Sequence, residues 1–364
     1  MRGTFFQSPT RRLPHIWTAN PEQAIWDLLR VLQQPAAVEN ILTGNSGARG
    51  GENVFSSELA GRRSRDIAYL IVQAEEYYRS AEVASLATRP LPLYYGMLTL
   101  SKAAILAWND EISLLDLKYH GLDSRPRSGD LKLYKETPDK WTLSDEYASA
   151  NSGVFTRLAG LYGVQNIAVG DVFTFDDILK TDAELAVAYN RMNNFGSLTF
   201  PLYSSTVSDD PVKIVMYPST RSVDEFKKIF AFIEPDFEIS PALLHDQAIT
   251  VTSRNHLLKS PAYLGFEHPD VGGRYIVGPA LNLSDGKKRR YVPRPIADYA
   301  GMFILSDLVR YRPQFWVEVV RGDPRGNVGL VSLFVASCRR RFAHAMLNAL
   351  YGERFSFGTA ARLG

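Results

Sequence analysis

Apolar residues recur three and four positions apart over the first third of the chain, and this spacing predicts helices. We expect one helix over residues 22–36 and two long helices over residues 57–108. Pro90 and Pro92 separate the two long helices, because proline ends one helix and can begin the next. The second long helix, residues 93–108, is apolar on most faces, so we place it at the centre of a helical bundle.

Helical spacing returns towards the end of the chain. Residues 296–311 and 327–351 carry apolar residues on one face, and residues 313–320 form a further predicted helix after a proline. Shorter helices are expected over residues 111–118, 152–163 and 181–194. Neither helical section has enough apolar surface to fold alone, so we expect both to pack into one bundle.

The middle of the chain is instead rich in β-branched and aromatic residues, in stretches bounded by Pro, Gly, Asp and Ser. Extended segments are expected over residues 197–207, 212–217, 248–252, 262–266 and 274–277. One predicted helix, residues 223–233, lies among them, and residues 123–150 are expected to form a loop and a small hairpin. This section predicts a small, mostly antiparallel sheet.

Together these patterns predict a mainly α fold with a β-rich insertion, which is an α+β architecture. The N- and C-terminal helices are expected to form one bundle around the small antiparallel sheet. The expected regions are an N-terminal segment with one helix and a flexible glycine-rich loop (1–56), a helical region (57–195), the β-rich insertion (196–292) and a C-terminal helical region packing on the bundle (293–364).

Composition limits the classes of function. Of the 364 residues, 45% are hydrophobic, and 41 Lys and Arg nearly balance 39 Asp and Glu, which gives a formal net charge of +2. This balance excludes a histone-like polycation and an acidic solvating chain, and it is compatible with local basic patches. The single cysteine, Cys338, excludes a disulfide within one chain and a cysteine-based zinc site.

We expect a cytoplasmic protein without a membrane span. Residues 1–20 contain no apolar stretch of signal-peptide length. The strongest candidate for a span, residues 91–108, contains Pro92, Ser101 and Lys102, which favours a buried helix of a soluble protein. The lack of disulfides fits a reducing compartment.

The chain carries no familiar catalytic or metal-binding motif. None of the six histidines stands in an H-E-x-x-H or similar spacing, so we expect no metal site and no cofactor. A G-x-S-x-G elbow is also missing. The glycine-rich stretch 43–53 lacks the G-K-[ST] ending of a phosphate-binding loop, so we interpret it as a flexible loop.

Three basic clusters are candidates for contacts with nucleic acid. They are Arg62, Arg63 and Arg65, then Lys287, Lys288, Arg289 and Arg290, then Arg339, Arg340 and Arg341. Clustered Lys and Arg bind phosphate well because counterions are released. Solvated surfaces of soluble proteins carry similar runs, so both interpretations stay open for each cluster.

The third cluster is the most specific, because His344 follows it. Arg339 and His344 have an R-x4-H spacing in the predicted C-terminal helix, and Arg340 shares a helix face with His344. An arginine can hold a phosphate while a histidine acts as general acid or base, which suits metal-independent RNA cleavage through the 2′-hydroxyl. Alternatively, these side chains only complement the dipole of the helix.

Three segments together resemble the YaaC-like family of bacterial proteins. They are QAEEYYRSAEVASLATRPLPLYYGMLTLSKAAIL (residues 73–106), YHGL (119–122) and YAGMFILSDLVRYRPQFW (299–316). They occur in the order that the family has and span most of the chain, although the β-rich middle is not part of the resemblance. The resemblance implies an architecture more than an activity.

The first long helices also resemble the HEPN superfamily, all-α domains found in many prokaryotic RNases, toxins and defence proteins. HEPN nucleases carry an R-x4–6-H motif at a helix end, often followed by glycine, and His120–Gly121 stands where such a motif would end. Residues 113–115 are Ser, Leu and Leu, so the arginine of the motif is missing there. The resemblance implies a homodimer, and a site that is either degenerate or completed by Arg310 or Arg339.

Arg310 is unusual in its own segment. It stands between Val309 and Tyr311 in an otherwise apolar predicted helix. A guanidinium in such a place needs a partner, which could be Asp307, Asp298 or a bound anion.

Two functions of different class follow from these residues. The first is an RNA- or nucleotide-directed, metal-independent endoribonuclease in bacterial stress or phage defence. In this hypothesis Arg339 binds phosphate, His344 is the general acid or base, and His120 with Arg310 forms a second site. The R-x4-H spacing favours this enzyme.

The second is a non-catalytic binding or scaffold module with a degenerate HEPN-like site, which recognises a nucleotide or a protein partner encoded in the same operon. The missing arginine before His120 favours this module. A small-molecule enzyme built on the β-rich insertion is a third alternative, for which the sequence has no motif.

Overall fold

The computed structural model divides the chain into two compact units, Met1–Asp176 with Pro295–Gly364, and Asp177–Arg294. The residues described are 14–44, 55–124, 141–164, 167–193, 197–198, 200–201, 213–216, 224, 237–241, 249–253, 266–267, 276–277, 281–282, 289–290, 292–322, 327–353 and 355–358. The predicted hairpin and glycine-rich loop fall largely outside these ranges, as does the predicted helix over residues 223–233 apart from Asp224.

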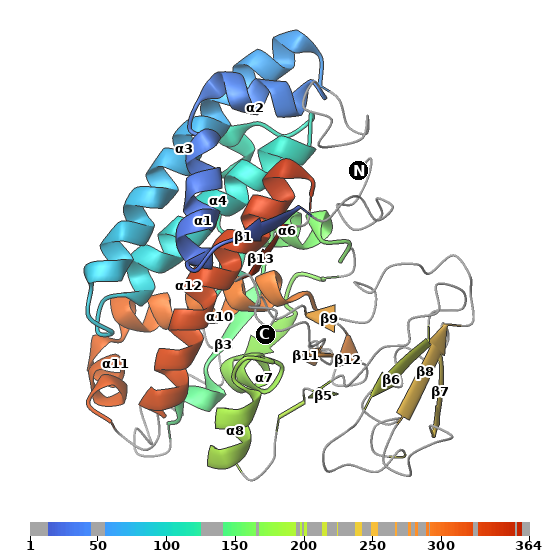
Figure 1. Ribbon diagram of the computed structural model, residues 1–364. Helices are drawn as coiled ribbons and strands as arrows, with labels where there is room; N and C mark the ends of the chain where they lie inside the picture. The colour runs from blue at the N-terminus through green and yellow to red at the C-terminus, as the bar shows by residue number, and fades with distance from the viewer. Residues whose placement is uncertain are drawn as a thin grey trace. The chain divides into compact units, whose positions relative to one another are not determined.

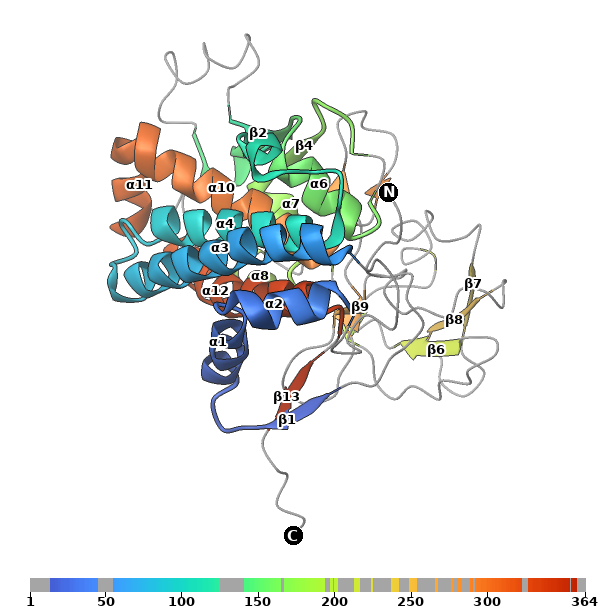
Figure 2. The same ribbon diagram turned by 90° about the horizontal axis from the view of Figure 1, so that it is seen from above.

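The first unit is built mainly of helices, as predicted. They are α1 (Pro21–Val31), α2 (Pro35–Leu42), α3 (Ser57–Val83), α4 (Pro90–Trp108), η1 (Leu114–Leu117), η3 (Leu143–Asp145), α6 (Val154–Leu161), α10 (Arg294–Tyr311, beginning in the second unit), α11 (Pro313–Val320) and α12 (Val328–Tyr351). Helices α3 and α4 lie side by side (Figure 1). Figure 2 shows α2 against α3 in the same unit.

Helix α4 lies at the centre of this bundle, as its all-round apolar pattern predicted. Most of its residues are buried, and it packs against α3, α6 and α12. Pro90 is its first residue, where proline's missing N–H leaves no helical hydrogen bond unmade. Among the described residues no helix is long and apolar enough to cross a membrane.

Three predicted helices differ from those in the structure. The helix expected over residues 181–194 is present only over Ala186–Met192. The helix expected over residues 22–36 is two helices, because Pro35 cannot continue α1 and instead begins α2. The helix expected over residues 111–118 is the single 3-10 turn η1, closed by a capping box in which Asp116 accepts hydrogen bonds from the Ser113 backbone and hydroxyl.

Two small sheets complete the first unit. Strand β1 (His15–Trp17) pairs in parallel with β13 (Ser356–Gly358), so segments from opposite ends of the chain lie together. Strands β2 (Leu122–Asp123), β3 (Tyr147–Ala150) and β4 (Val172–Thr174) form an antiparallel sheet in the order β2-β3-β4. The sequence pattern predicted neither β1, β13 nor β4, because strands of three residues are too short to show a period.

The second unit contains α8 (Ala186–Met192) and small antiparallel sheets, and α7 (Phe175–Lys180) crosses into it from the first unit. The strands are β5 (Phe200–Pro201), β6 (Lys213–Met216), β7 (Phe237–Pro241), β8 (Ile249–Ser253), β9 (Phe266–Glu267), β10 (Ile276–Val277), β11 (Leu281–Asn282) and β12 (Arg289–Arg290). They pair as β5-β10-β9, β11-β12 and β6-β8-β7. The antiparallel pairing is as predicted, whereas the single expected sheet is replaced by separate small ones.

The contact between α3 and α4 depends on Gly96. A Cβ atom at Gly96 would lie 2.6 Å from Cδ2 of the buried Tyr78 ring, closer than two carbon atoms can approach. We therefore expect Gly96→Ala to lower the free energy of unfolding by about 1–3 kcal/mol, because the helices must separate.

The matched control is Gly61→Ala in α3. There a Cβ would lie 3.7 Å from the nearest atom, so alanine should raise stability by up to about 1 kcal/mol through its helix propensity. Urea unfolding of the intact chain measures both variants. Equal effects of the two substitutions would contradict the assigned contact.

Candidate functional site

His120 is held in a turn between η1 and β2. Its carbonyl accepts hydrogen bonds from the Tyr299 hydroxyl at 3.1 Å and from the Phe155 N–H at 3.0 Å. The Leu122 N–H donates to Nδ1 at 3.2 Å, and the ring packs against Phe303 of α10 with ring centroids 5.1 Å apart. The imidazole is therefore fixed in position from both sides, and Nδ1 is its accepting nitrogen.

Gly121 makes this turn feasible. Its φ of 82° lies in the left-handed region, and a Cβ there would come within 2.9 Å of the Phe155 backbone nitrogen. The His-Gly pair noticed in the sequence thus has a structural reason, since only glycine fits beside the start of α6.

Arg310 lies in the last turn of α10, near residues of α4. Its Nε donates to the Ser306 carbonyl at 3.3 Å and its Nη1 to the Tyr95 hydroxyl at 3.5 Å, while Nη2 lies 4.0 Å from Asp307 Oδ1. The guanidinium also stacks over the Tyr311 ring at 4.9 Å. These contacts orient a half-buried cation.

His120 and Arg310 lie against the same face of α10, because the His120 ring packs on Phe303 and Arg310 follows Phe303 by seven residues, or two helical turns. Burial is the main cause that lowers the pKa of His120, and the charge of Arg310 is the second, outweighing the opposite effect of Asp123. The result is a neutral imidazole within the electrostatic reach of a permanent guanidinium. In the sequence these residues stand far apart, and the contact of α4 and the β2 turn with α10 closes that separation.

A carboxylate network supports this end of α10. Arg312 donates from both Nη atoms to the two carboxylate oxygens of the buried Glu146, which also accepts from Trp141 Nε1. Burial raises the pKa of Asp307, although Ser124, Arg312 and Arg310 act in the opposite direction. Sequence reasoning missed Arg312 and Glu146, for which the only signal was a second arginine in the apolar 299–316 segment.

Two buried tyrosines connect α4 to His120. The Tyr94 hydroxyl donates to that of Tyr299 at 3.4 Å, and Tyr299 in turn donates to the His120 carbonyl. Burial raises the pKa of both hydroxyls, so they remain protonated donors. We call His120, Arg310, Asp307, Tyr95 and Tyr299 the α10 site.

Arg339 and His344 are both on α12, but their described contacts do not bring them together. Five residues of α-helix turn their side chains about 140° apart. Arg339 faces Glu22 of α1, with Nη2 3.0 Å from Oε1. His344 Nε2 lies 2.9 Å from the Phe355 carbonyl, and its ring packs on Phe357 of β13.

The other arginines of that cluster also diverge. Arg341 makes a two-point ion pair with Asp298, at 3.0 Å from Nε and 2.9 Å from Nη2, and the Asp298 side chain is fully buried. Asp298 is thus the partner of Arg341, and of the two partners expected for Arg310 only Asp307 lies beside it. Arg340 is half-buried on α12.

Only part of the second basic cluster, residues 287–290, lies within the described residues. Arg289 and Arg290 form β12, whose side chains are not described, and Lys287 and Lys288 lie outside the described residues. Across the described ranges no three His, Cys, Asp or Glu side chains gather in a way that could hold a metal ion.

Comparison with known proteins adds one result to this geometry. The family model described as YaaC-like Protein matches residues 33–350. The chain belongs to the YaaC-like family. The matched region includes His120, Arg310, Arg339 and His344. Searches of curated proteins and of solved structures found no match for this YaaC-like protein.

The lowered pKa of His120 predicts a pH-dependent contribution to stability. The unfolded chain binds a proton to this residue at a higher pH than the folded chain does, so the unfolding free energy falls as pH drops below about 6.5. His120→Gln removes this difference in proton binding between the folded and the unfolded chain. Unfolding of both proteins between pH 7.5 and 5 should therefore show wild type losing more stability, and parallel curves would contradict the assignment.

Arg341 is expected to stabilise the fold. Arg341→Gln removes an ion pair from a buried carboxylate, and should lower the free energy of unfolding by about 3 kcal/mol. Arg62→Gln is the control, because the exposed Arg62–Glu58 pair, at 3.6 Å, should contribute less than about 0.5 kcal/mol. A small effect of Arg341→Gln in denaturant unfolding would instead leave this arginine available for nucleic acid.

Proposed function

We propose that this YaaC-like protein acts on RNA, and that the α10 site cleaves RNA without a metal ion. The observation that carries the proposal is that the His120 imidazole packs on Phe303, on the face of α10 that carries the Arg310 guanidinium two turns later, where burial and the charge of Arg310 keep the imidazole neutral. A guanidinium can hold a phosphodiester and the charge that develops on it. A neutral imidazole can take the proton of the 2′-hydroxyl that attacks the same phosphodiester. The P–O5′ bond then breaks, which leaves a 2′,3′-cyclic phosphate, and the 5′-oxygen takes a proton from the imidazolium or from water. A homodimer and a role in stress or phage defence remain predictions.

Each neighbour has a separate task in this proposal. Asp307 and Tyr95 orient the guanidinium of Arg310, so that its remaining N–H groups face the phosphodiester. Tyr299 holds the backbone of His120 through the carbonyl. They are positioning residues, and His120 and Arg310 are the two groups that touch substrate.

One contact favours a second candidate, a module that binds RNA or a nucleotide without cleaving it. Because Leu122 N–H donates to Nδ1, the neutral imidazole of His120 carries its own hydrogen on Nε2. Nε2–H can donate to a phosphate oxygen beside Arg310, which suits binding. Accepting a proton at Nδ1 requires the ring to give up its bond with Leu122.

The decisive experiment is cleavage of a mixed-sequence RNA by the purified protein in EDTA. We expect wild type to cleave, and His120→Ala and Arg310→Ala each to lower the rate at least about 100-fold. Arg310→Lys should rescue only part of the rate, because lysine keeps the charge but not the planar fork.

His344→Ala and Arg339→Ala are the matched controls, and they should cleave like wild type. If these two variants lost cleavage and His120→Ala did not, the catalytic site would lie on α12, and the proposal would be contradicted. RNA binding without cleavage, weakened by Arg310→Ala, would identify the binding module instead.

A pH profile tests the role of His120 separately. If His120 is the base, kcat/KM should fall on the acidic side with a pKa below the ordinary histidine value of about 6.5, because burial and Arg310 disfavour its protonated form. An acidic limb above about 6.5 would exclude His120 as the base.

A further inference from the structure

A line of half-buried residues runs along α4, the helix at the centre of the bundle. The residues of this helix that are not buried are Leu91, Pro92, Tyr95, Leu98 and Lys102. Tyr95, Leu98 and Lys102 stand three and four positions apart, so they lie on one face of the helix. We call these three residues the α4 stripe.

One end of the α4 stripe belongs to the α10 site. The Tyr95 hydroxyl accepts a hydrogen bond from Arg310 Nη1 at 3.5 Å. The Tyr95 ring also stacks on Tyr77 of α3, with ring centroids 5.7 Å apart and an interplanar angle of 27°. A nucleic acid chain held by Arg310 therefore has the α4 stripe beside it.

The other end of the α4 stripe is a cation without a partner. The ammonium group of Lys102 makes no hydrogen bond or ion pair with any residue that the structure describes. Burial lowers the pKa of Lys102, and no described carboxylate acts in the opposite direction. The cost of taking this charge partly out of water is thus not offset within the described part of the chain.

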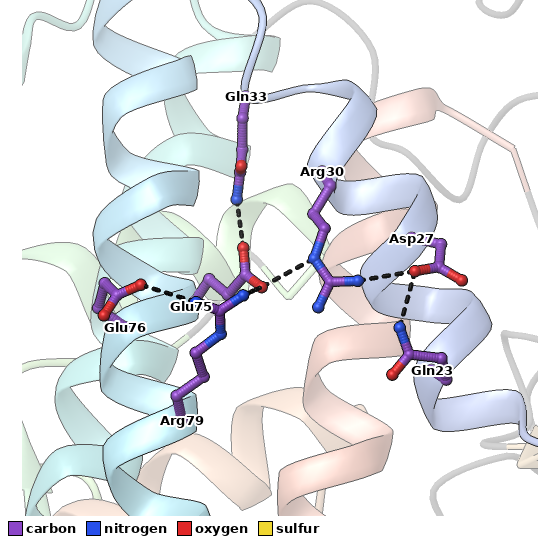
Figure 3. A network of polar contacts seen from close by, with 7 residues as sticks. All are labelled: Gln23, Asp27, Arg30, Gln33, Glu75, Glu76 and Arg79. Carbon is purple, nitrogen blue, oxygen red and sulfur yellow. Dashed lines mark hydrogen bonds and ion pairs between the residues drawn. The ribbon is translucent and has the colours of Figure 1, made fainter.

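A buried charge elsewhere in the same unit is fully paired (Figure 3). Arg30 Nε and Arg79 Nη2 both donate to Oε1 of the buried Glu75, at 2.8 and 2.7 Å, and the Gln33 amide donates to Oε2. Burial alone would raise the pKa of Glu75, but the Gln33 and Arg30 hydrogen bonds and the two arginine charges lower it overall. Lys102 has no such compensation, which indicates that an anion from outside the fold completes it.

The separation of the two cations suits a chain of phosphates. Seven residues, or two helical turns, lie between Tyr95 and Lys102, which is about 10.5 Å along the helix axis. Phosphates of one strand recur about every 3.4 Å in a stacked duplex, so this distance corresponds to about three nucleotides. A single phosphate at Arg310 is too short to reach Lys102.

The surface between the two cations suits unpaired bases. Leu98 lies between Tyr95 and Lys102 on the stripe, and the stacked rings of Tyr77 and Tyr95 lie at the Arg310 end. Single-stranded RNA can pack its bases on aromatic and apolar side chains while its phosphates bind cations. A duplex has its bases stacked inside and offers no such contact.

We propose that the α4 stripe continues the α10 site and binds single-stranded RNA, with one phosphate at Arg310, a further phosphate at Lys102, and bases against Tyr95 and Leu98. This inference rests on the proposed function, because Arg310 holds the first phosphate. It adds Lys102 as a binding residue, and it assigns the substrate class as single-stranded RNA.

Calorimetric titration of the intact protein with 2′-O-methyl hexauridylate tests the proposal, because this RNA has no free 2′-hydroxyl and stays intact. Lys102→Gln should bind it at least about fivefold more weakly. The slope of log K against log salt concentration should become shallower by about 0.7, since one phosphate contact is lost. Unchanged affinity and salt slope in Lys102→Gln would overturn the proposal.

A mononucleotide tests the separation of the two phosphates. Uridine 3′-monophosphate cannot reach Lys102 from Arg310, so wild type and Lys102→Gln should bind it equally. If Lys102→Gln weakened the mononucleotide as much as the hexamer, Lys102 would not hold a separate phosphate, and the proposal would be wrong.

Arg310→Ala separates this inference from the proposed function. If Arg310→Ala weakens hexamer binding and Lys102→Gln does not, the α10 site stands and the assignment of Lys102 is wrong. If wild type does not bind the hexamer, both proposals are wrong. If only Lys102→Gln weakens binding, the RNA does not pass Arg310, and the continuity of the two sites is contradicted.

Two further ligands test the substrate class. A short blunt-ended 2′-O-methyl duplex should bind more weakly than either of its separate strands, because its bases cannot reach the stripe. Inorganic tripolyphosphate should also bind more weakly than the hexamer. Tripolyphosphate binding as tight as that of the hexamer, with the same dependence on Lys102, would show a site for phosphate chains alone and contradict the assignment to RNA.

Lys180→Gln is the matched control. Lys180 of α7 is also half-buried and lies outside the stripe, so its replacement should change neither the affinity nor the salt slope. Lys102→Arg keeps the charge and should keep the salt slope of wild type. Equal losses in Lys180→Gln and Lys102→Gln would show an effect of net charge and contradict the site.

Urea unfolding shows whether Lys102→Gln acts through the fold. The substitution removes a half-buried charge that has no partner among the described residues, so the free energy of unfolding should stay unchanged or rise. A large loss of stability would identify Lys102 as a residue that supports the fold, and would contradict its assignment to RNA.

Discussion

Exclusion of water from almost all sides of α4 is the constraint on which the helical unit depends. A helix with apolar residues all round must be enclosed, and α3, α6 and α12 enclose it. Its polar side chains obey the same constraint. The hydroxyls of Thr99 and Ser101 donate to carbonyls one turn back, at Tyr95 and Met97, so their burial leaves no donor without a partner.

Polar groups lie at the edges of this core. Gly96 leaves room on α4 for the Tyr78 ring of α3, which also packs edge to face on Trp26 of α1. On another face of α4, Tyr94 and Tyr95 reach α10, Tyr94 through Tyr299 and Tyr95 through Arg310. A rigid apolar centre thus positions polar groups that come from distant parts of the chain.

Runs of arginine in this sequence do not form a single surface, because neighbouring residues of a helix point about 100° apart. Arg339 faces Glu22 of α1, and Arg341 is paired with the buried Asp298. Burial near a carboxylate converts much of a formal basic patch into structural ion pairs. Net charge and clustering in the sequence therefore give a poor measure of which guanidiniums remain for a ligand.

Much of the helical fold could be predicted from the sequence. The period of the apolar residues and the positions of proline give α3, α4, α10, α11 and α12 within a few residues, because both act locally. The sequence also singled out His120–Gly121 and Arg310 as residues that needed an explanation. Strands β1, β4 and β13, of three residues each, escaped prediction because they are too short to show a period, and the five-residue β7 escaped prediction as well.

The sequence by itself determined which segments become helices and which residues carry charge, since helix periodicity and side-chain chemistry are local properties. Only the tertiary structure decided that His120 packs on the face of α10 that carries Arg310, that Glu75 holds two arginines, and that the Tyr78 hydroxyl has no hydrogen-bond partner among the described residues. These relations depend on the directions in which side chains leave helices that meet only after packing, and no spacing along the chain encodes such directions.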